Sequence, residues 1–359
     1  MKKTARIAAV AAVAALALSA CGEREDSSTT SEPTTSTTEA APSESSEQYP
    51  DTKACMVSDS GGFDDKSFNQ TALKGQTDAE SMFGVQTAQV ESNADSEYAD
   101  NINQLVQDGC SIITTVGFLL GDATEAAAKK NKNVDFAIVD YAYEKPSDNL
   151  KGLVFATDQP SFMAGYLAAA QTETGVVGTF GGLNIPTVTV FMEGFRRGIE
   201  YFNEENGGDV QLLGWDGSDG SFTEDFEDKT KGQQVAEQMI QQGADIIFPV
   251  AGPAGLGGLQ AASENDAFGI WVDVDGYEST EYGDILLTSV VKGIDVAVTE
   301  AIRESGSGEF SNELFSGTLE NGGVSLAPFH DFDGEIDQEV KDALTEIQDG
   351  IISGEIQTS

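Results

Sequence analysis

The sequence predicts an α/β protein with two doubly wound lobes, and three observations support this prediction. Apolar strand-like runs alternate with helix-like segments along residues 51–359, which is typical of parallel sheets covered by helices. One helix–strand segment occurs twice, once in each half of this region. Gly-rich turns and carboxylates follow several apolar runs, at the place where open α/β sheets bind ligands.

Residues 1–20 have the features of a secretory signal. Three basic residues precede the apolar run 8–18, which is too short to span a bilayer as a stable helix. The run ends in Leu18-Ser-Ala-Cys21, which resembles the cleavage box of bacterial lipoproteins. We expect Cys21 to become the lipid-bearing N-terminus on the extracytoplasmic face of the membrane. Ordinary secretion with cleavage nearby is the alternative.

Residues 21–50 are expected to form a disordered tether after the lipidated Cys21. Ser, Thr, Pro and acidic residues dominate this segment, and Tyr49 is its only large apolar side chain. Such a composition cannot bury enough apolar surface to offset the entropy lost on ordering. The body of the protein would then work close to a membrane without entering it.

The chain is strongly acidic, with 61 Asp and Glu against 19 Lys and Arg and a formal net charge of −42. This charge argues against nucleic acid as a partner, because phosphate binding requires basic patches. We interpret it as a solvated surface that keeps an exported protein soluble. Adaptation to a salt-rich setting is the alternative.

Two cysteines remain besides Cys21, and each stands near an apolar strand-like run. These residues are Cys55 and Cys110. In a doubly wound sheet of strand order 2-1-3, the two runs are neighbours. The pattern favours a structural disulfide in an oxidising compartment. Two buried free thiols are the alternative.

The predicted elements alternate along the body. In the first half they are the strand 54–57, the helices 71–83 and 96–108, the strand 111–116, a helix from 122 and the strand 135–140. In the second half the predicted strands are 175–180, 209–214, 245–250, 269–274, 285–289 and 323–327. The predicted helices there are 189–203, 229–242, 294–303 and 340–352.

Residues 104–116 and 238–250 align without a gap, and each consists of a helix end, a Gly and a buried strand. This repeat predicts two similar lobes. We assign 51–156 and about 277–320 to the N-terminal lobe. We assign 157–276 and about 321–359 to the C-terminal lobe, with a closing helix. Crossings near 155–158, 275–277 and 322–328 would form a three-segment hinge that closes on a small ligand.

The sequence contains few residues suited to catalysis. His330 is the single histidine, and no free catalytic-type cysteine accompanies it, which argues against Ser-His-Asp and Cys-His sites. The Asp-rich turns lack EF-hand spacing, and the Gly-rich turn 251–258 lacks the Gly-Lys-Ser/Thr of a P-loop. We therefore expect no cofactor, no metal and no enzymatic activity.

The remaining candidates are polar and aromatic residues at strand ends and helix starts, namely Asp59, Asp140, Asp273, Phe68, Phe191, Phe195 and Lys292. A carboxylate accepts hydrogen bonds from paired hydroxyls, and aromatic faces stack on flat rings. A flat ring joined to a diol describes a nucleoside. Core packing is the alternative for each Phe, and helix capping is the alternative for each Asp.

Gly62-Phe-Asp-Asp-Lys-Ser-Phe-Asn-Gln70 resembles the signature of the basic membrane protein family, the purine-nucleoside-receptor-like substrate-binding lipoproteins of ABC transporters. Further likenesses follow in order at 115–117, 139–141, 164–168, 181–186, 191–195, 247–252, 272–273 and 288–292. The resemblance implies a type I periplasmic-binding fold that captures purine nucleosides by lobe closure.

The resemblance also implies a role for each site residue. Phe68 and Phe191 would stack on the base, with Phe195 as the alternative second ring. Asn69 and Asp140 would contact the base edge, and an ionised Asp140 would favour guanosine and inosine. The ribose would be held by three residues beside the Gly252 backbone, namely Asp59, Asp273 and Lys292.

The sequence thus predicts a monomeric, membrane-anchored solute-binding protein that delivers a purine nucleoside to an ABC transporter permease. Three alternatives remain. One is a receptor for a sugar or another small metabolite on the same fold. Another is an exported hydrolase that uses Asp59, Asp64 and Asp65 for acid–base chemistry. The third is a sensing or adhesive lipoprotein without a transport role.

Overall fold

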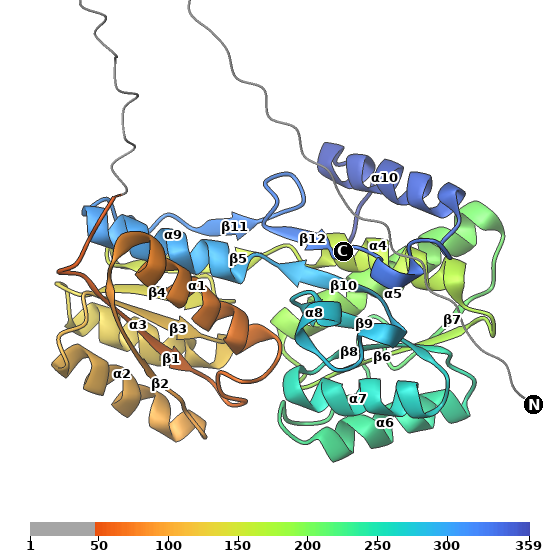
Figure 1. Cartoon of the computed structure of the whole chain (residues 1–359), viewed down its shortest axis with the longest axis horizontal. Helices are drawn as coiled ribbons and strands as arrows, with labels where there is room; N and C mark the ends of the chain where they lie inside the picture. Colours follow the sequence, from red (N-terminus) through yellow and green to blue (C-terminus); the bar gives the residue numbers. More distant parts are fainter. Residues whose placement is uncertain (1–46) are drawn as a thin grey trace, which may run out of the picture. The chain divides into compact units, whose positions relative to one another are not determined.

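The computed structural model describes residues 47–359. The predicted signal segment, the lipidation site Cys21 and most of the predicted tether lie outside the described residues. The described part contains two six-stranded sheets, each with helices on both faces (Figure 1). The predicted α/β class with two doubly wound lobes is therefore confirmed.

The end of the predicted tether belongs to the folded body, which corrects the boundary at residue 50. The backbone N–H of Tyr49 donates to the Phe83 carbonyl at 2.7 Å, and the two rings lie 5.9 Å apart. Tyr49 is the one large apolar side chain of that segment, and packing it against Phe83 orders the residues around it.

The first lobe contains a fully parallel sheet with the strand order β11-β5-β4-β3-β1-β2. Its strands are β1 (Lys53–Ser58), β2 (Gln86–Val90), β3 (Ile112–Val116), β4 (Asp135–Val139), β5 (Leu150–Phe155) and β11 (Phe315–Gly317). Its helices are α1 (Phe68–Phe83), α2 (Tyr98–Gln107), α3 (Gly121–Lys130) and α9 (Ile294–Ser307). Figure 1 shows α1 and α9 on one face of the sheet and α2 and α3 on the other.

The second lobe repeats this arrangement with the order β12-β10-β9-β8-β6-β7, in which only β12 is antiparallel. Its strands are β6 (Val176–Gly181), β7 (Gln211–Leu213), β8 (Ile246–Val250), β9 (Phe268–Asp273), β10 (Leu286–Lys292) and β12 (Val324–Leu326). Its helices are α4 (Asp158–Gln171), α5 (Pro186–Asn206), α6 (Lys229–Gln241), α7 (Gly252–Glu264), the single turn α8 (Gly276–Ser279) and α10 (Gln338–Ser353).

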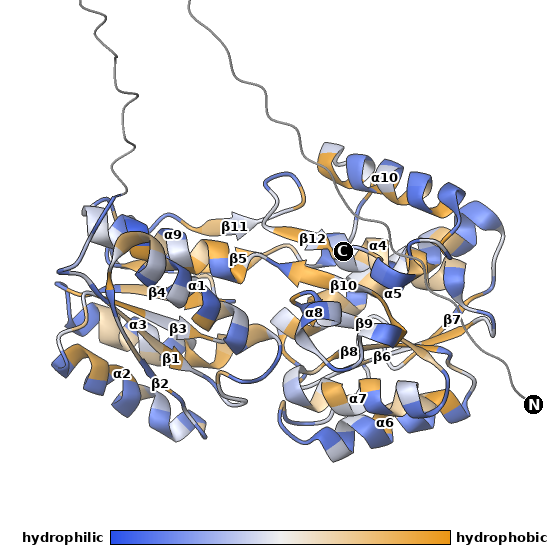
Figure 2. Ribbon diagram, viewed as in Figure 1, coloured by the Kyte–Doolittle hydropathy of each residue, from blue (hydrophilic) through white to orange (hydrophobic). Residues whose placement is uncertain are grey.

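Hydrophobic patterning explains these layers. The strands are mostly apolar and the helices combine apolar and polar faces (Figure 2). In α2, Tyr98, Ile102 and Leu105 are buried at helical spacing, and Gly109 follows the helix with a φ of 78°. In the second lobe α4 is buried on nearly all sides, because α5, α10 and the sheet surround it.

The internal repeat has a structural counterpart. Residues 104–116 end in β3 and residues 238–250 end in β8, and both strands hold the third position from the edge of their sheets. By the same rule β4 and β9 are equivalent strands, and so are β5 and β10.

Two of the predicted crossings require correction. The chain leaves the first lobe after β5, near the predicted place, but it returns after β10 at Gly293 and not at 275–277. The reason is that β10 pairs with β9 and β12, so residues 277–292 belong to the second lobe. The third crossing lies between β11 and β12, at residues 318–323. The Gly-rich segment 251–258, predicted as a turn, forms the start of α7.

Cys55 and Cys110 form a disulfide, with their Cα atoms 6.0 Å apart. Cys55 lies on β1, and Cys110 stands just before β3, its neighbour in the sheet. The bridge therefore ties adjacent strands on the face covered by α2 and α3.

Candidate functional site

The carboxyl ends of both sheets face a shared cavity between the lobes. The space not filled by atoms is about 620 Å³, part of which opens to solvent. All eight predicted ligand-binding residues line this cavity, and they are Asp59, Phe68, Asn69, Asp140, Phe191, Gly252, Asp273 and Lys292. The structure therefore brings together residues that are more than 200 positions apart in the chain. The predicted alternative Phe195 is fully buried and packs on Phe248 instead, with ring centroids 4.8 Å apart.

Two strand-end carboxylates occupy equivalent places in the two lobes. Asp140 follows β4 and Asp273 ends β9. Their φ values are 66° and 69°, in the left-handed region that non-glycine residues rarely adopt. Strained backbone of this kind persists where surrounding structure enforces it and is often found at binding sites. The paired outliers aim two carboxylates at the same point from opposite lobes.

That point is the ammonium of Lys292, at the end of β10. Its Nζ lies 2.6 Å from Asp140 Oδ2 and 3.6 Å from Asp273 Oδ1. Only 3% of the lysine is exposed. Burial acts to lower the pKa of Lys292, but the charges of the two carboxylates outweigh it and raise the pKa. The lysine therefore stays positively charged.

Aromatic rings surround the same ammonium. Lys292 Nζ lies 4.9 Å from the centroid of Phe68, 5.2 Å from Phe191 and 5.7 Å from Phe155. These are cation–π distances. The ammonium consequently occupies space next to both Phe68 and Phe191, while Phe191 itself is only 2% exposed.

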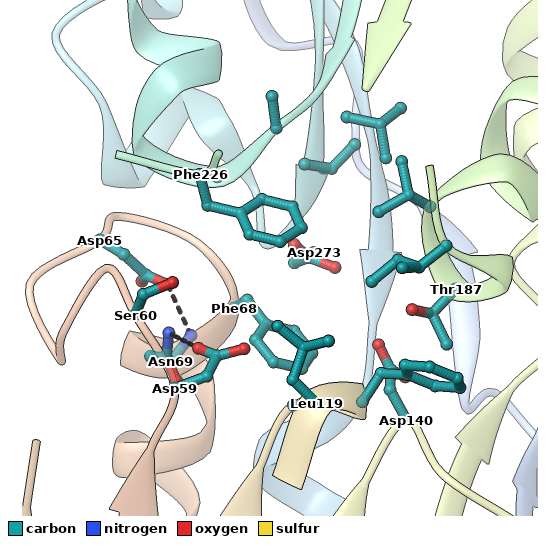
Figure 3. Close-up of a pocket in the computed structure, with 18 of the residues that line it drawn as sticks. Asp59, Ser60, Asp65, Phe68, Asn69, Leu119, Asp140, Thr187, Phe226 and Asp273 are labelled. Atoms are coloured by element: carbon teal, nitrogen blue, oxygen red, sulfur yellow. Dashed lines mark hydrogen bonds between the residues drawn. The ribbon is translucent and has the colours of Figure 1, made fainter. Parts of the chain in front are cut away.

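A second polar pair lies on the first-lobe side of the cavity. Asn69 Nδ2 donates to Asp59 Oδ1 at 2.9 Å, as the dashed line between these two residues in Figure 3 shows. The amide oxygen of Asn69 is buried and has no protein partner. Burial raises the pKa of Asp59 to about 8, although the Asn69 hydrogen bond opposes the rise. This pair therefore offers an unused acceptor and a carboxyl group that gains a proton easily.

The neighbouring acidic residues have structural roles. Asp65 accepts backbone hydrogen bonds from Ser67, Asn69 and Gln70 at 3.0, 2.7 and 3.0 Å, which satisfies the free N–H groups that begin α1. Asp64 is exposed and pairs with Lys66 outside the cavity. The three carboxylates of the hydrolase alternative are thus not gathered at one reacting centre.

Sequence reasoning missed Phe226, which lines the cavity from the segment between β7 and α6. Its ring lies against Gly182, where an added Cβ would come within 2.3 Å of it, and its carbonyl accepts from Ala254 N at 2.8 Å. Figure 3 shows Phe226 and Phe68 entering from opposite lobes. No periodic pattern marks this irregular segment, so only a search for unpaired aromatics would have found it.

Among residues 47–359, no cluster of three or more His, Cys, Asp or Glu has a geometry suited to a metal ion. Within the same range, no helix is both long and apolar enough to cross a bilayer.

Two doubly wound lobes around an interlobe cavity form the type I periplasmic-binding fold that the sequence predicts. A family model described as ABC transporter substrate-binding protein PnrA-like matches residues 52–358. An ABC transporter system solute-binding protein from Aeropyrum pernix K1 has a TM-score of 0.77 at 25% identity, covering 85% of this chain and 92% of that one.

Curated relatives agree with this assignment. The ABC transporter nucleoside-binding protein BmpA of Lactococcus lactis is 31% identical over 326 residues, covering 85% of this chain and 88% of the relative. Basic membrane protein A1 of Borrelia garinii is 30% identical over 244 residues, covering 67% of this chain and 69% of the relative. The chain belongs to the Bmp family of ABC transporter substrate-binding proteins.

Proposed function

We propose that this protein captures a purine nucleoside between its lobes and delivers it to an ABC transporter permease. The cavity itself is the main support, because it combines aromatic faces with carboxylates and a single buried lysine. Aromatic faces suit a flat base and carboxylates suit ribose hydroxyls. The L. lactis relative is named a nucleoside-binding protein, which agrees with this proposal.

We assign the base to the space between Phe68 and Phe226. These rings belong to different lobes and both line the cavity. Phe191, the ring that the resemblance implies, is nearly inaccessible, because only 2% of the residue is exposed. Phe226 is therefore the better second face.

The polar groups fall into two sets that suggest a division of roles. Asn69 and Asp59 are bonded to each other and present the buried amide oxygen, so we assign them to the base edge. Asp140, Lys292 and Asp273 form a charged triad, which we assign to the ribose hydroxyls. This exchanges the base and ribose roles that the family resemblance implies for Asp59 and Asp140.

The test is calorimetric titration of the purified protein with guanosine, inosine, adenosine and ribose. We expect at least one nucleoside to bind and ribose alone to bind far more weakly, because it lacks the base. No binding of any nucleoside would refute the proposal. Tight binding of ribose would indicate a sugar receptor. Release of free base from the nucleoside during incubation would indicate a hydrolase.

Substitutions separate the stacking role from the fold. Phe68→Ala and Phe226→Ala should each weaken nucleoside binding by about five- to 150-fold, because base–aromatic stacking contributes about 1–3 kcal/mol. Phe222→Ala is the matched control, since Phe222 lies in the same segment outside the cavity and packs on Trp215. If Phe191→Ala weakens binding while Phe226→Ala does not, the ring assignment is wrong.

Lipid anchoring at Cys21 and an extracytoplasmic location are part of this proposal and rest on the sequence. Cys21→Ser should release the protein from the membrane fraction into the medium. Retention of the variant in membranes would contradict anchoring at this residue. Loss of nucleoside uptake when the protein is deleted would support a role in transport. Unchanged uptake would support a sensing or adhesive role.

A further inference from the structure

We infer that the carbonyl of Lys66 is the acceptor of a latch that holds the two lobes closed, and that Trp271 is its principal donor. The latch consists of Lys66 in the first lobe and Trp271 and Ser279 in the second. None of the three lines the cavity. For its choice of probe, this inference rests on the proposed function.

The contacts cross from one lobe to the other. Trp271 Nε1 donates to the Lys66 carbonyl oxygen at 3.3 Å, and Ser279 Oγ donates to the same oxygen at 3.2 Å. Trp271 lies on β9 and Ser279 ends α8, both in the second lobe. One carbonyl group thus accepts two hydrogen bonds from separate elements of the opposite lobe.

The acceptor is held rigidly by the first lobe. Lys66 has a φ of 60°, a left-handed conformation that is strained for a lysine. Its backbone N–H donates to Gln70 Oε1 at 3.1 Å, and the Asp65 carboxylate next to it fixes the start of α1. This turn directs the Lys66 carbonyl away from α1 and toward β9, which accounts for the strained conformation.

The donor is equally fixed. Trp271 is fully buried among Leu256, Leu259 and Leu286 of the second lobe. Its indole N–H has the Lys66 carbonyl as its acceptor in this structure. Opening the lobes removes that acceptor, so the N–H must then find water.

The latch is coupled to the cavity through its neighbours in the chain. Ser67 Oγ donates to Asp273 Oδ2 at 2.8 Å, again across the lobes. Asp273 is a member of the charged triad, and Phe68 follows Ser67 directly. Engagement of the latch therefore fixes a stacking ring and a triad carboxylate in one movement, which makes Trp271 and Ser279 positioning residues for capture.

The chain offers a matched control, because it contains two tryptophans. Trp215 Nε1 donates to Glu193 Oε2 at 3.0 Å, within the second lobe. Trp271→Phe and Trp215→Phe each delete one indole N–H hydrogen bond and keep an aromatic ring. Only the first deletes a bond between the lobes.

We expect Trp271→Phe and Ser279→Ala each to weaken guanosine binding by up to about fivefold, because a lost hydrogen bond shifts the open–closed equilibrium by about a factor of five and the apparent affinity follows the closed fraction. Trp215→Phe should leave affinity unchanged. Ser279→Ala keeps the inference testable should Trp271→Phe fail to fold. Equal affinities in latch and control variants would overturn the inference.

A measurement without ligand separates this inference from the proposed function. In small-angle X-ray scattering, the ligand-free double variant Trp271→Phe/Ser279→Ala should have a larger radius of gyration than wild type and Trp215→Phe. If no nucleoside binds wild type, the proposed function fails while this comparison still decides the latch. Identical radii in all three proteins would refute the latch.

Discussion

Replacing Lys292 by Met tests how the buried triad is held together. Methionine resembles the apolar stem of lysine in length but lacks the ammonium, so Asp140 and Asp273 are left without a cation between them. At separations of 2.6 and 3.6 Å the lysine attracts these carboxylates by about 6 and 5 kcal/mol if the effective dielectric constant is about 20. Most of this attraction offsets the cost of burying the charges, and removing one partner of a buried pair typically costs about 3–5 kcal/mol.

We therefore expect Lys292→Met to lower the free energy of unfolding by about 3–5 kcal/mol at pH 7.5, measured by urea denaturation. Burial already raises the pKa of Asp140 in the wild type, and Lys292 opposes that rise. Without the ammonium, the pKa of Asp140 rises further. Groups with raised pKa values favour the folded state at low pH, and that contribution is lost as the pH rises. The difference in free energy of unfolding between wild type and Lys292→Met should accordingly become smaller as the pH falls from 7.5 to 5.

Lys74 supplies the control. Its Nζ also contacts two carboxylates, Asp78 at 2.6 Å and Asp295 at 2.8 Å, but 59% of its side chain is exposed. Exposed pairs of this kind contribute about 1 kcal/mol or less. If Lys74→Met destabilises the protein as much as Lys292→Met, or if the deficit does not depend on pH, burial of the triad is not the source of the effect.

Three further predictions concern stability. Because burial raises the pKa of Asp59 to about 8, the stability of wild type relative to Asp59→Asn should fall by about 1 kcal/mol per pH unit between pH 5 and 8; parallel pH profiles would contradict this. Replacing Cys55 and Cys110 by Ala should lower the free energy of unfolding by about 4 kcal/mol in urea denaturation, since the disulfide joins residues 55 positions apart. An unchanged midpoint would show that loss of the disulfide does not increase the conformational entropy of the unfolded chain. Gly75→Ala should lower the melting temperature, because its Cβ would lie 2.5 Å from a backbone oxygen of α9, whereas Gly334→Ala meets open space and should leave it unchanged.

Much of the fold was predictable because its signals are local. The alternation of apolar runs and helical periods determines most elements, and the repeat at 104–116 and 238–250 predicts two similar lobes. The site residues could also be predicted from the sequence, since Asp59, Asp140 and Lys292 stand at strand ends that parallel sheets bring to one edge.

The assignment of β10 failed because pairing between strands is a long-range property. A run such as Leu286–Lys292 is equally suited to either sheet, and nothing in its own residues specifies the strands with which it pairs. Its pairing with β9 and β12 moved the second crossing to Gly293. Phe226 escaped notice for a related reason, because Gly182 and Ala254, which hold it, are distant in sequence.

The return of the chain to the first lobe has a consequence for how the protein matures. Helix α9 and strand β11 complete that lobe, although they come from residues 294–317. A chain that emerges N-terminus first and stops after β5 exposes the unpaired edge of β5 and the surface of α1 that α9 covers. The second lobe still lacks β12 and α10 at residue 317. The first lobe is therefore completed only at residue 317 and the second lobe only after α10. A C-terminal truncation before β11 leaves both lobes incomplete.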